Sequence, residues 1–173
     1  AEYDKGAKSL TLHSTTQIPG IVRDKLSEIF DLPGPRVRVI APDVGGGFGG
    51  KTSLYSEEIV ASAISRALGK PIKWVSDRME DLMTTGHAFD EVVYADIAVT
   101  KDGEIVGLKA DVIGDVGAYS IYPWTATIEP VQVVSFMPGP YRIENYAARV
   151  RAVATNKTLT GAYRGVGRPI SCL

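Results

Sequence analysis

The residues best suited to chemistry lie in one stretch, Gly45-Gly46-Gly47-Phe48-Gly49-Gly50-Lys51. Five of the six residues 45–50 are glycines. Glycine has no Cβ and adopts positive φ readily, so the backbone N–H groups of such a stretch can approach a ligand closely. The residues that follow have helical spacing, and a helix N-terminus adds N–H groups and a positive partial charge. The stretch therefore predicts a site for a negatively charged group.

Two nucleotide-binding motifs overlap in this stretch. Gly45, Gly47 and Gly50 match the dinucleotide fingerprint, and Gly45–Thr52 matches the phosphate-binding loop G-x-x-x-x-G-K-[ST]. The dinucleotide interpretation needs an acid about 20 residues further on, at the end of a strand, but the chain is still helical there. The phosphate-loop interpretation needs a second strand that ends in a magnesium-binding Asp. The candidate, Pro71–Asp77, contains a charged lysine. A P-loop-like nucleotide-binding protein remains an alternative.

Composition argues against several classes of partner. The chain has 19 Lys and Arg residues and 20 Asp and Glu residues, for a net charge of −1. This balance gives no basic surface for nucleic acid and no polybasic membrane patch. The longest apolar runs are far shorter than the ~20 residues of a membrane span. The single cysteine, Cys172, allows no internal disulfide, which predicts a cytoplasmic protein.

The hydrophobic pattern predicts the elements that position the glycine-rich stretch. A buried strand at 37–41 delivers the chain to it, and a helix at 54–68 follows. An earlier helix runs from about residue 19 to 31. A long β-hairpin spans 91–116, with Asp-Gly at its turn. We expect a single α+β domain over residues 1–173, with a mixed β-sheet, the two main helices packed on one face, and the hairpin extending the sheet.

Three further features carry polar or aromatic groups. Gln17 lies at a strand-to-helix junction, where it is either functional or simply a polar junction residue. Residues 119–140 form a long, aromatic, irregular segment, which suits a substrate role or an interface equally well. Near the end of the chain, Arg164 and Arg168 alternate with glycines. Guanidinium groups bind phosphate and oxyanions in a bidentate manner, although the segment alone also fits a basic surface loop.

Taken together, these segments resemble the large subunit of the molybdenum hydroxylases: xanthine dehydrogenase, aldehyde oxidase and carbon monoxide dehydrogenase. The resemblance covers nearly the whole chain but only part of the catalytic subunit, so we expect a fragment of a molybdopterin-binding large subunit. The matching segments, in the family's order, are Thr16-Gln17, the glycine-rich stretch, Asp115–Tyr119, Thr155–Lys157 and Ala162–Arg168.

The resemblance implies roles for individual residues. Gln17 matches the glutamine whose side-chain amide binds an oxygen ligand of molybdenum, the glycines and Phe48 match the loop that packs against metal and pterin, and Arg164 matches the arginine beside them. The protein supplies no direct metal ligand, because the metal is held through the pterin, expected in its cytosine dinucleotide form. The implied catalytic residues are Gln17, Phe48 and Arg164, and the implied cofactor-binding residues are Gly46, Gly47, Phe48, Gly49, Gly50, Arg164 and Gly165.

Departures from the family pattern restrict the substrate. Gly165 stands where carbon monoxide dehydrogenases carry a copper-bridging cysteine, which argues against copper chemistry. Purine oxidisers carry an acid where this chain has Thr52, an arginine near Gln132, and an aromatic residue at Val166. The resemblance is closest to the carbon monoxide dehydrogenase-like group with an Ala-Tyr-Arg-Gly-x-Gly-Arg loop. It implies oxidation of an aldehyde, an N-heterocycle or a related small molecule with water-derived oxygen.

The chain lacks other parts that the resemblance implies. The family's general base is a glutamate that nothing here matches, so we expect the isolated fragment to be inactive. Glu57 and Glu58 are interpreted as first-turn acids that complement the helix dipole. Iron–sulfur clusters need several cysteines, so we expect them on a small subunit, and FAD on a medium subunit. A non-catalytic interaction domain is a further alternative.

Overall fold

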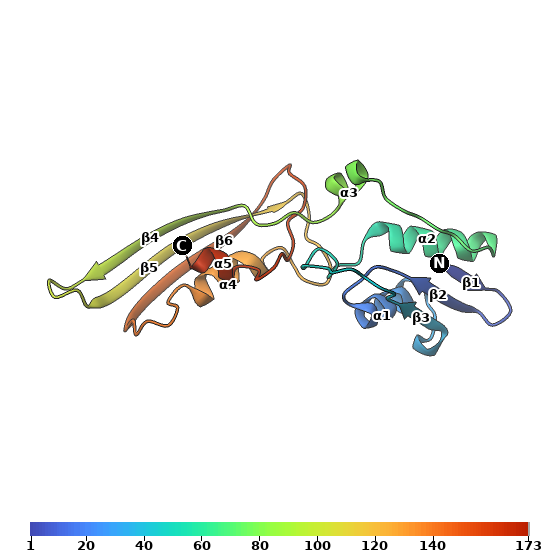
Figure 1. Cartoon of the computed structure of the whole chain (residues 1–173), viewed down its shortest axis with the longest axis horizontal. Coiled ribbons are helices and arrows are strands. Elements are labelled where there is room, and N and C mark those ends of the chain that lie inside the picture. Colours follow the sequence, from blue (N-terminus) through green and yellow to red (C-terminus); the bar gives the residue numbers. More distant parts are fainter. Residues whose placement is uncertain (173) are drawn as a thin grey trace. The chain divides into compact units, whose positions relative to one another are not determined.

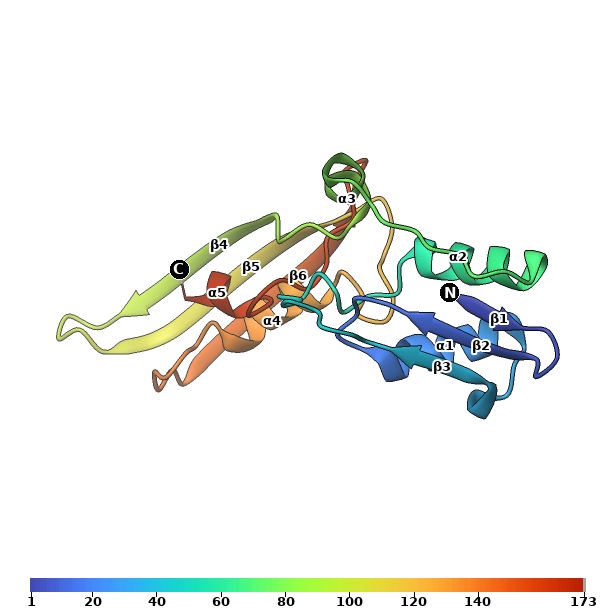
Figure 2. The same cartoon turned by 45° about the vertical axis from the view of Figure 1, so that its right-hand side comes forward.

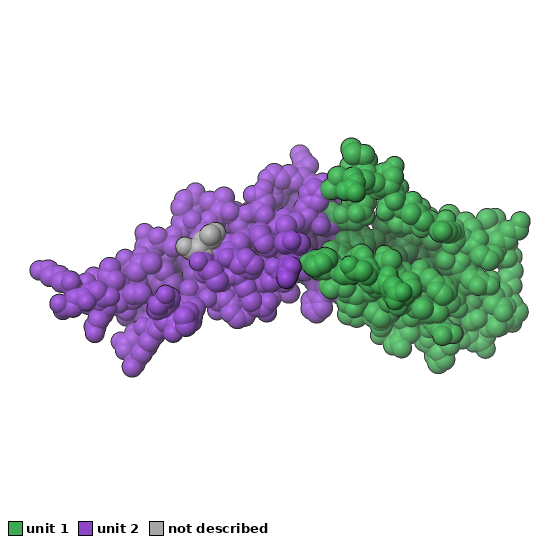
Figure 3. Space-filling model, viewed as in Figure 1, with its two compact units in different colours: residues 1–85 green, residues 86–173 purple. Residues whose placement is uncertain are grey.

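The computed structural model describes residues 1–172, and the chain divides into two compact units, residues 1–85 and 86–173 (Figure 3). The α+β class predicted from the sequence is confirmed. The prediction of a single mixed sheet is wrong, because the strands form two separate three-stranded sheets, with orders β1-β2-β3 and β4-β5-β6. Each sheet is mixed, with one antiparallel and one parallel pair.

In the first unit, α1 and α2 pack against the three-stranded sheet, and α3 follows them along the chain (Figure 1). β2 pairs antiparallel with β1 and parallel with β3, so β2 lies at the centre. The predicted helices and the glycine-loop strand are present with slightly shifted ends, and a short N-terminal strand is added. The elements are β1 (Glu2–Asp4), β2 (Ser9–His13), α1 (Pro19–Phe30), a 3-10 turn (Gly34–Arg36), β3 (Val37–Ile40), α2 (Ser56–Leu68) and α3 (Arg78–Thr84).

The core of the first unit forms on one face of this sheet. Leu10 and Leu12 of β2 lie in register with Val37 and Val39 of β3, so the four side chains share that face. Both main helices contribute to the core, α1 with fully buried residues and α2 with partly buried ones. The cluster consists of Leu10, Leu12, Val22, Leu26, Leu32 and Val37, with Ile18, Phe30, Val39, Leu54 and Ile59 among its partly buried neighbours.

The second unit contains the predicted hairpin (Figure 2). It does not extend the first sheet, because its second strand pairs with β6 instead. One face of this second sheet is covered by α4, which contacts β5 and β6. The elements are β4 (Glu91–Val99), β5 (Ile105–Gly117), α4 (Ile128–Phe136), β6 (Asn145–Ala154) and α5 (Arg168–Ser171).

Two local predictions differ from the structure. The segment 119–140 is not irregular throughout, since it contains α4. Pro130 lies in the first turn of this helix, where a missing N–H costs little. The candidate strand Pro71–Asp77 joins no sheet within residues 1–172; Ile72 exchanges backbone hydrogen bonds with Ala1. Among residues 1–172, no helix is long and apolar enough to cross a membrane.

Candidate cofactor site

The glycine loop, residues 45–51, has an unusual backbone. Gly45, Gly46, Phe48 and Gly49 all have positive φ, at 69°, 104°, 50° and 98°. Glycine adopts such angles freely, but Phe48 does so at a cost, and strain of this kind concentrates at functional sites. The Phe48 ring lies over Gly46, where a Cβ would come within 2.6 Å of it. The side chain is nevertheless 58% exposed.

Gln17 contacts the glycine loop directly. Its Oε1 accepts a hydrogen bond of 3.0 Å from the Gly49 N–H, and its own backbone N–H donates to the Lys51 carbonyl at 2.9 Å. A Cβ on Gly47 would lie 2.2 Å from the Gln17 amide carbon. A side chain at position 47 would therefore displace Gln17 from the loop. Because Gly49 needs an acceptor, the Gln17 amide is oriented with Nε2 as the end that can donate elsewhere.

Three side chains hold the C-terminal end of the loop. The Lys51 ammonium donates to the Val44 carbonyl at 2.9 Å, the Tyr55 hydroxyl donates to the Gly50 carbonyl at 2.6 Å, and Thr52 Oγ1 donates to the Gly49 carbonyl at 2.5 Å. A phosphate-binding loop uses its lysine on phosphates and opens directly into a helix. Here Lys51 closes the loop on itself and α2 begins only at Ser56. This geometry argues against the nucleotide interpretation.

Glu58 links the strand before Gln17 to the helix after the loop. Its carboxylate accepts hydrogen bonds from the Ser14 hydroxyl and, at 3.0 Å, from the Tyr55 backbone N–H. Burial raises the pKa of Glu58 above its ordinary value, and these two hydrogen bonds oppose the shift. Glu57 and Glu58 do lie in the first turn of α2, as expected. Glu58 is in addition a structural link that the sequence did not reveal.

A pocket of about 730 Å³ opens beside the glycine loop within the first unit. Its walls include Thr16, Gly47, Gly50, Lys51 and Tyr55. This volume lies in the range of small-molecule and cofactor sites. The walls also carry Glu57, Glu58 and Asp81. The size of the pocket and its place beside the glycine loop fit a pterin-sized group. No cluster of three or more His, Cys, Asp or Glu residues that could hold a metal ion occurs within residues 1–172.

The arginine loop, residues Ala162–Arg168, belongs to the second unit. The Val166 N–H donates to the Tyr163 carbonyl at 2.6 Å, which closes a tight turn with Arg164 and Gly165 at its centre. Gly165 has a φ of 90°, as the third residue of a type II turn requires, and Val166 has a φ of 55°. A positive φ at a β-branched residue is a genuine outlier. The turn presents Arg164 at an exposed position.

Both ends of the arginine loop are held by α4. The Glu129 carboxyl accepts a hydrogen bond of 3.4 Å from the Tyr163 N–H. A Cβ on Gly167 would lie 2.2 Å from the Glu129 carbonyl oxygen, so the loop packs directly on the helix backbone. The Arg168 guanidinium lies 4.9 Å from the centre of the Phe136 ring.

The structure thus brings some of the expected site residues together. Gln17, Gly47 and Gly49 are in contact in the first unit, whereas Arg164 and Gly165 belong to the second. Sequence reasoning missed the residues that support the two loops. One signal was available, because Glu129 is the one ionisable residue of the mostly apolar stretch Ile128–Phe136. The missed residues are Ser14, Tyr55 and Glu129.

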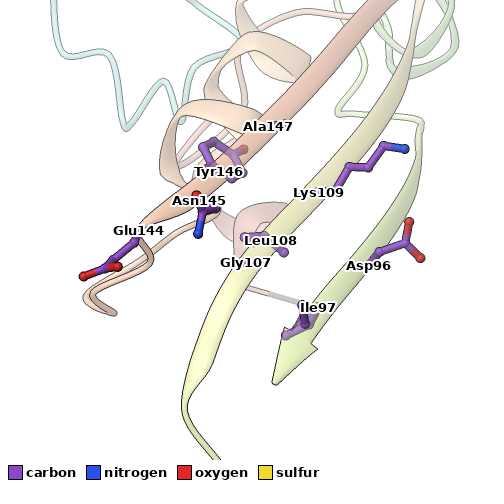
Figure 4. A pocket seen from close by; sticks show the side chains of 10 residues that line it. Asp96, Ile97, Gly107, Leu108, Lys109, Glu144, Asn145, Tyr146 and Ala147 are labelled. Atoms are coloured by element: carbon purple, nitrogen blue, oxygen red, sulfur yellow. The ribbon is translucent and has the colours of Figure 1, made fainter. Parts of the chain in front are cut away.

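A separate groove of about 550 Å³ lies on the second sheet, between β4, β5 and β6 (Figure 4). Asp96 and Lys109 on neighbouring strands extend to the same side, and Glu144 lies at the other end. The lining residues also include Ile97, Gly107 and Leu108. This groove contains none of the expected site residues, so we do not assign it to the cofactor.

Comparison with known proteins identifies related chains. The carbon monoxide dehydrogenase large chain of Hydrogenophaga pseudoflava is 38% identical over 165 residues, which is 95% of this chain and 20% of that protein. The nicotine 6-hydroxylase large subunit of Paenarthrobacter nicotinovorans is 36% identical over 168 residues, or 96% of this chain and 21% of that protein. The crystal structure of quinoline 2-oxidoreductase from Pseudomonas putida 86 superimposes with a TM-score of 0.94 at 38% identity, covering 96% of this chain and 21% of that one.

The chain therefore spans about a fifth of the length of the relatives that it matches. Its match to the molybdopterin cofactor-binding domain extends over residues 1–173. The resemblance to molybdenum hydroxylases found in the sequence is confirmed by both kinds of comparison. The chain belongs to the molybdopterin cofactor-binding domain family.

Proposed function

We propose that this chain supplies part of the molybdenum-cofactor site of a hydroxylase catalytic subunit. The observation that carries the proposal is the seating of Gln17 on the glycine loop, through its hydrogen bond from Gly49 and the absence of space for a Cβ at Gly47. When bound, the molybdenum cofactor supplies the redox chemistry for hydroxylation with water-derived oxygen. The family match supports the cofactor, and the roles of individual residues are our proposal.

The residues of the chain orient and bind. Gln17 fixes its Oε1 on Gly49, which leaves Nε2 as the end of the amide that would donate to an oxygen of the bound cofactor. Such a donor, set in place before the reaction, stabilises charge where it develops. The backbone of the glycine loop, with positive φ at Gly46, Phe48 and Gly49, would offer N–H groups to the pterin, and Phe48 would pack against it. Arg164, on its tight turn, binds an anionic part of the cofactor.

The arginine loop also bears on the chemistry. Gly165 has a φ of 90°, and a Cβ there would approach Pro169 to 2.9 Å. A cysteine at this position would be strained, so we propose that the chain does not use a copper-bridging thiolate. Nicotine 6-hydroxylase and quinoline 2-oxidoreductase are named for N-heterocyclic substrates. Those relatives support an N-heterocycle as substrate here, with an aldehyde as the alternative.

The proposal extends to the assembly. We propose the cytosine dinucleotide form of molybdopterin, an iron–sulfur small subunit and a FAD medium subunit, with the general base elsewhere in the large subunit. A cytoplasmic location and a single domain over residues 1–173 also remain predictions. The short length relative to the catalytic relatives supports the view that further chain completes the site.

The test is molybdenum content, measured by elemental analysis on the chain co-expressed and purified with the rest of its subunit and its partners. We expect one molybdenum per assembly in the wild type and a loss of several-fold or more in the double variant Gln17→Ala, Phe48→Ala. Met79→Ala is the matched control, since Met79 is 64% exposed and Phe48 is 58% exposed. Tight magnesium–ATP binding without molybdenum would instead identify the glycine loop as a nucleotide site.

A further inference from the structure

Two glutamates from different elements meet inside the second unit. Glu129 lies in α4 and is 2% exposed. Glu91 begins β4 and is the register partner of Gly114 on β5. Gly114 in turn lies against Pro130, the neighbour of Glu129, because a Cβ on Gly114 would come within 2.8 Å of the Pro130 ring. Both side chains therefore enter the layer between the sheet and α4, where the charge of Glu91 acts on the Glu129 carboxyl.

The layer between the second sheet and α4 contains many hydrogen-bond acceptors and few donors. Both carboxylate oxygens of Glu91 and the amide oxygen of Gln132 are buried without a hydrogen-bond partner among the described residues. Glu129 receives the Tyr163 N–H at 3.4 Å. Buried polar atoms are almost always paired, and two uncompensated buried carboxylates would repel each other strongly. A proton kept on one carboxyl would turn an acceptor into a donor and remove one charge.

The titration behaviour agrees with this geometry. Burial raises the pKa of Glu91 to about 7. Burial also raises the pKa of Glu129 to about 7, with a further upward contribution from the charge of Glu91 and an opposing one from the Tyr163 hydrogen bond. Carboxyls that interact in this way titrate as a pair.

The charged groups of the surrounding elements are engaged elsewhere. On β5 and β6, Asp111 pairs with Arg149 and Arg151 on the face of the sheet opposite α4. Lys157 forms ion pairs with Asp90 and Asp115. α4 carries no second ionisable residue. On the α4 side of β6, the Tyr146 hydroxyl donates to the Val134 carbonyl of α4. The arginine loop itself adds the ionisable residues Tyr163, Arg164 and Arg168.

We propose that Glu129 is a positioning residue for the arginine loop, and that it acts as one half of a buried carboxyl pair with Glu91 that shares a proton. Glu129 touches both ends of the loop, through its side chain at Tyr163 and its backbone oxygen at Gly167. The turn between these two anchors contains the strained Val166. The role in catalysis rests on the proposed function, in which this loop carries Arg164 to the cofactor.

The test is hydrogen exchange of the Tyr163 amide in the full chain between pH 5.5 and 8.5, corrected for the intrinsic exchange rate. In the wild type we expect protection to fall by about tenfold or more above pH 7, when the second carboxyl ionises; a tenfold change corresponds to about 1.4 kcal/mol. Glu91→Gln replaces the shared proton with amide donors, so protection should persist at pH 8.5. Glu129→Gln should also flatten the profile, and Glu129→Leu should lose protection at every pH.

Glu144→Gln is the control, because Glu144 is exposed and should reproduce the wild-type profile. If protection of the Tyr163 amide in the wild type does not change with pH and equals that of Glu91→Gln, the proposal of a shared proton is wrong. Full Tyr163 protection in Glu129→Leu would overturn the positioning role. If Glu129→Leu fails to fold, the profiles of the two glutamine variants decide the matter. Since the measurement needs no molybdenum, its failure is distinct from failure of the cofactor proposal.

Discussion

At the scale of single residues, the glycine loop depends on positions where the side chain decides the backbone. Gly47 leaves room for Gln17 and for nothing else, while Phe48 occupies a conformation that glycine would adopt without strain. Position 47 is therefore a glycine because Gln17 occupies the space of a side chain. Position 48 carries a large side chain although its positive φ favours glycine, as expected when a side chain is kept for a ligand rather than for stability.

Gly47→Ala is expected to destabilise the first unit by about 1–3 kcal/mol, because its Cβ would force Gln17 from its place. Molybdenum content of the assembly should fall in parallel. Gly20→Ala is the matched control, since nothing lies within 4 Å of the added Cβ in α1. That control should stabilise by about 0.5–1 kcal/mol, as alanine does in helices. Denaturant unfolding measures the stability of both variants. Equal changes in stability for Gly47→Ala and Gly20→Ala would contradict the steric argument.

Phe48→Gly should separate stability from binding. Removing a non-glycine residue from positive φ recovers about 1–2 kcal/mol, against about 0.5–1 kcal/mol of added chain entropy. We expect stability equal to or up to ~1 kcal/mol above the wild type, with molybdenum content reduced. Phe48→Ala keeps the strain and should be no more stable than the wild type. A marked loss of stability in Phe48→Gly would show that the ring serves the fold.

At the scale of elements, two helices hold the two loops by different means. α2 holds the glycine loop through polar links at its first turn, Glu58 to Ser14 and Tyr55 to Gly50. α4 holds the arginine loop through direct backbone packing and one buried carboxyl. The attachment of the glycine loop to α2 should weaken when single hydrogen-bonding groups are removed. The attachment of the arginine loop to α4 should depend on pH.

Glu58→Ala is expected to cost about 1–2 kcal/mol, because it removes a cap at the Tyr55 N–H and the tie to Ser14. Glu57→Ala, one residue away in the same turn, should cost only the helix-dipole term of about 0.3–1 kcal/mol. Chemical unfolding of both variants gives the comparison. A double-mutant cycle with Ser14→Ala should yield a coupling energy of about 0.5 kcal/mol or more. Additive stability losses in Glu58→Ala and Ser14→Ala would contradict the hydrogen bond between these two side chains.

The carboxyl pair predicts a pH dependence of stability. Glu91 and Glu129 have pKa values of about 7 in the folded chain and an ordinary value of 4.5 when unfolded. The folded state thus holds protons that the unfolded state releases, so stability is full below about pH 4.5 and falls as pH rises through about 7. Solvent screens part of the burial cost at Glu91, which leaves a fall of about 1–2 kcal/mol. Thermal unfolding at pH 5.5 and at pH 8 should show this loss of stability, and the loss should be smaller in Glu91→Gln.

At the scale of the whole molecule, we propose that the chain supplies binding loops to a larger catalytic subunit. It covers about a fifth of the catalytic relatives. Many large apolar side chains remain exposed along the chain. The most exposed of them include Val75, Met83, Tyr94, Ile97, Tyr119 and Tyr141.

The chain alone is therefore expected to show no turnover of N-heterocycles or aldehydes with an artificial electron acceptor. Activity should appear only when the remaining large-subunit chain and the partner subunits are present. The measurement is acceptor reduction by the chain alone and by the purified assembly. In the assembly, Arg164→Lys should reduce activity by about tenfold or more, because a lysine cannot replace a bidentate fork. Turnover by the chain alone would place the general base within these residues.

The sequence by itself determined the features that depend on local chemistry. Helices near 19–31 and 54–68, the hairpin turn at Asp102-Gly103 and the glycine loop all follow from periodicity and from residues with special φ, which neighbours along the chain decide. The ordered set of motifs was specific enough to indicate the molybdenum hydroxylases, and the comparisons confirmed this family.

Only the tertiary structure decided what depends on contacts between distant residues. The division into two sheets follows from the pairing of β5 with β6 across some 40 positions, which no local pattern encodes. The Gln17–Gly49 hydrogen bond and the packing of the arginine loop on α4 also depend on residues far apart in the sequence. Local propensity selects the element, whereas burial and hydrogen bonding among distant segments select the partners of each site residue.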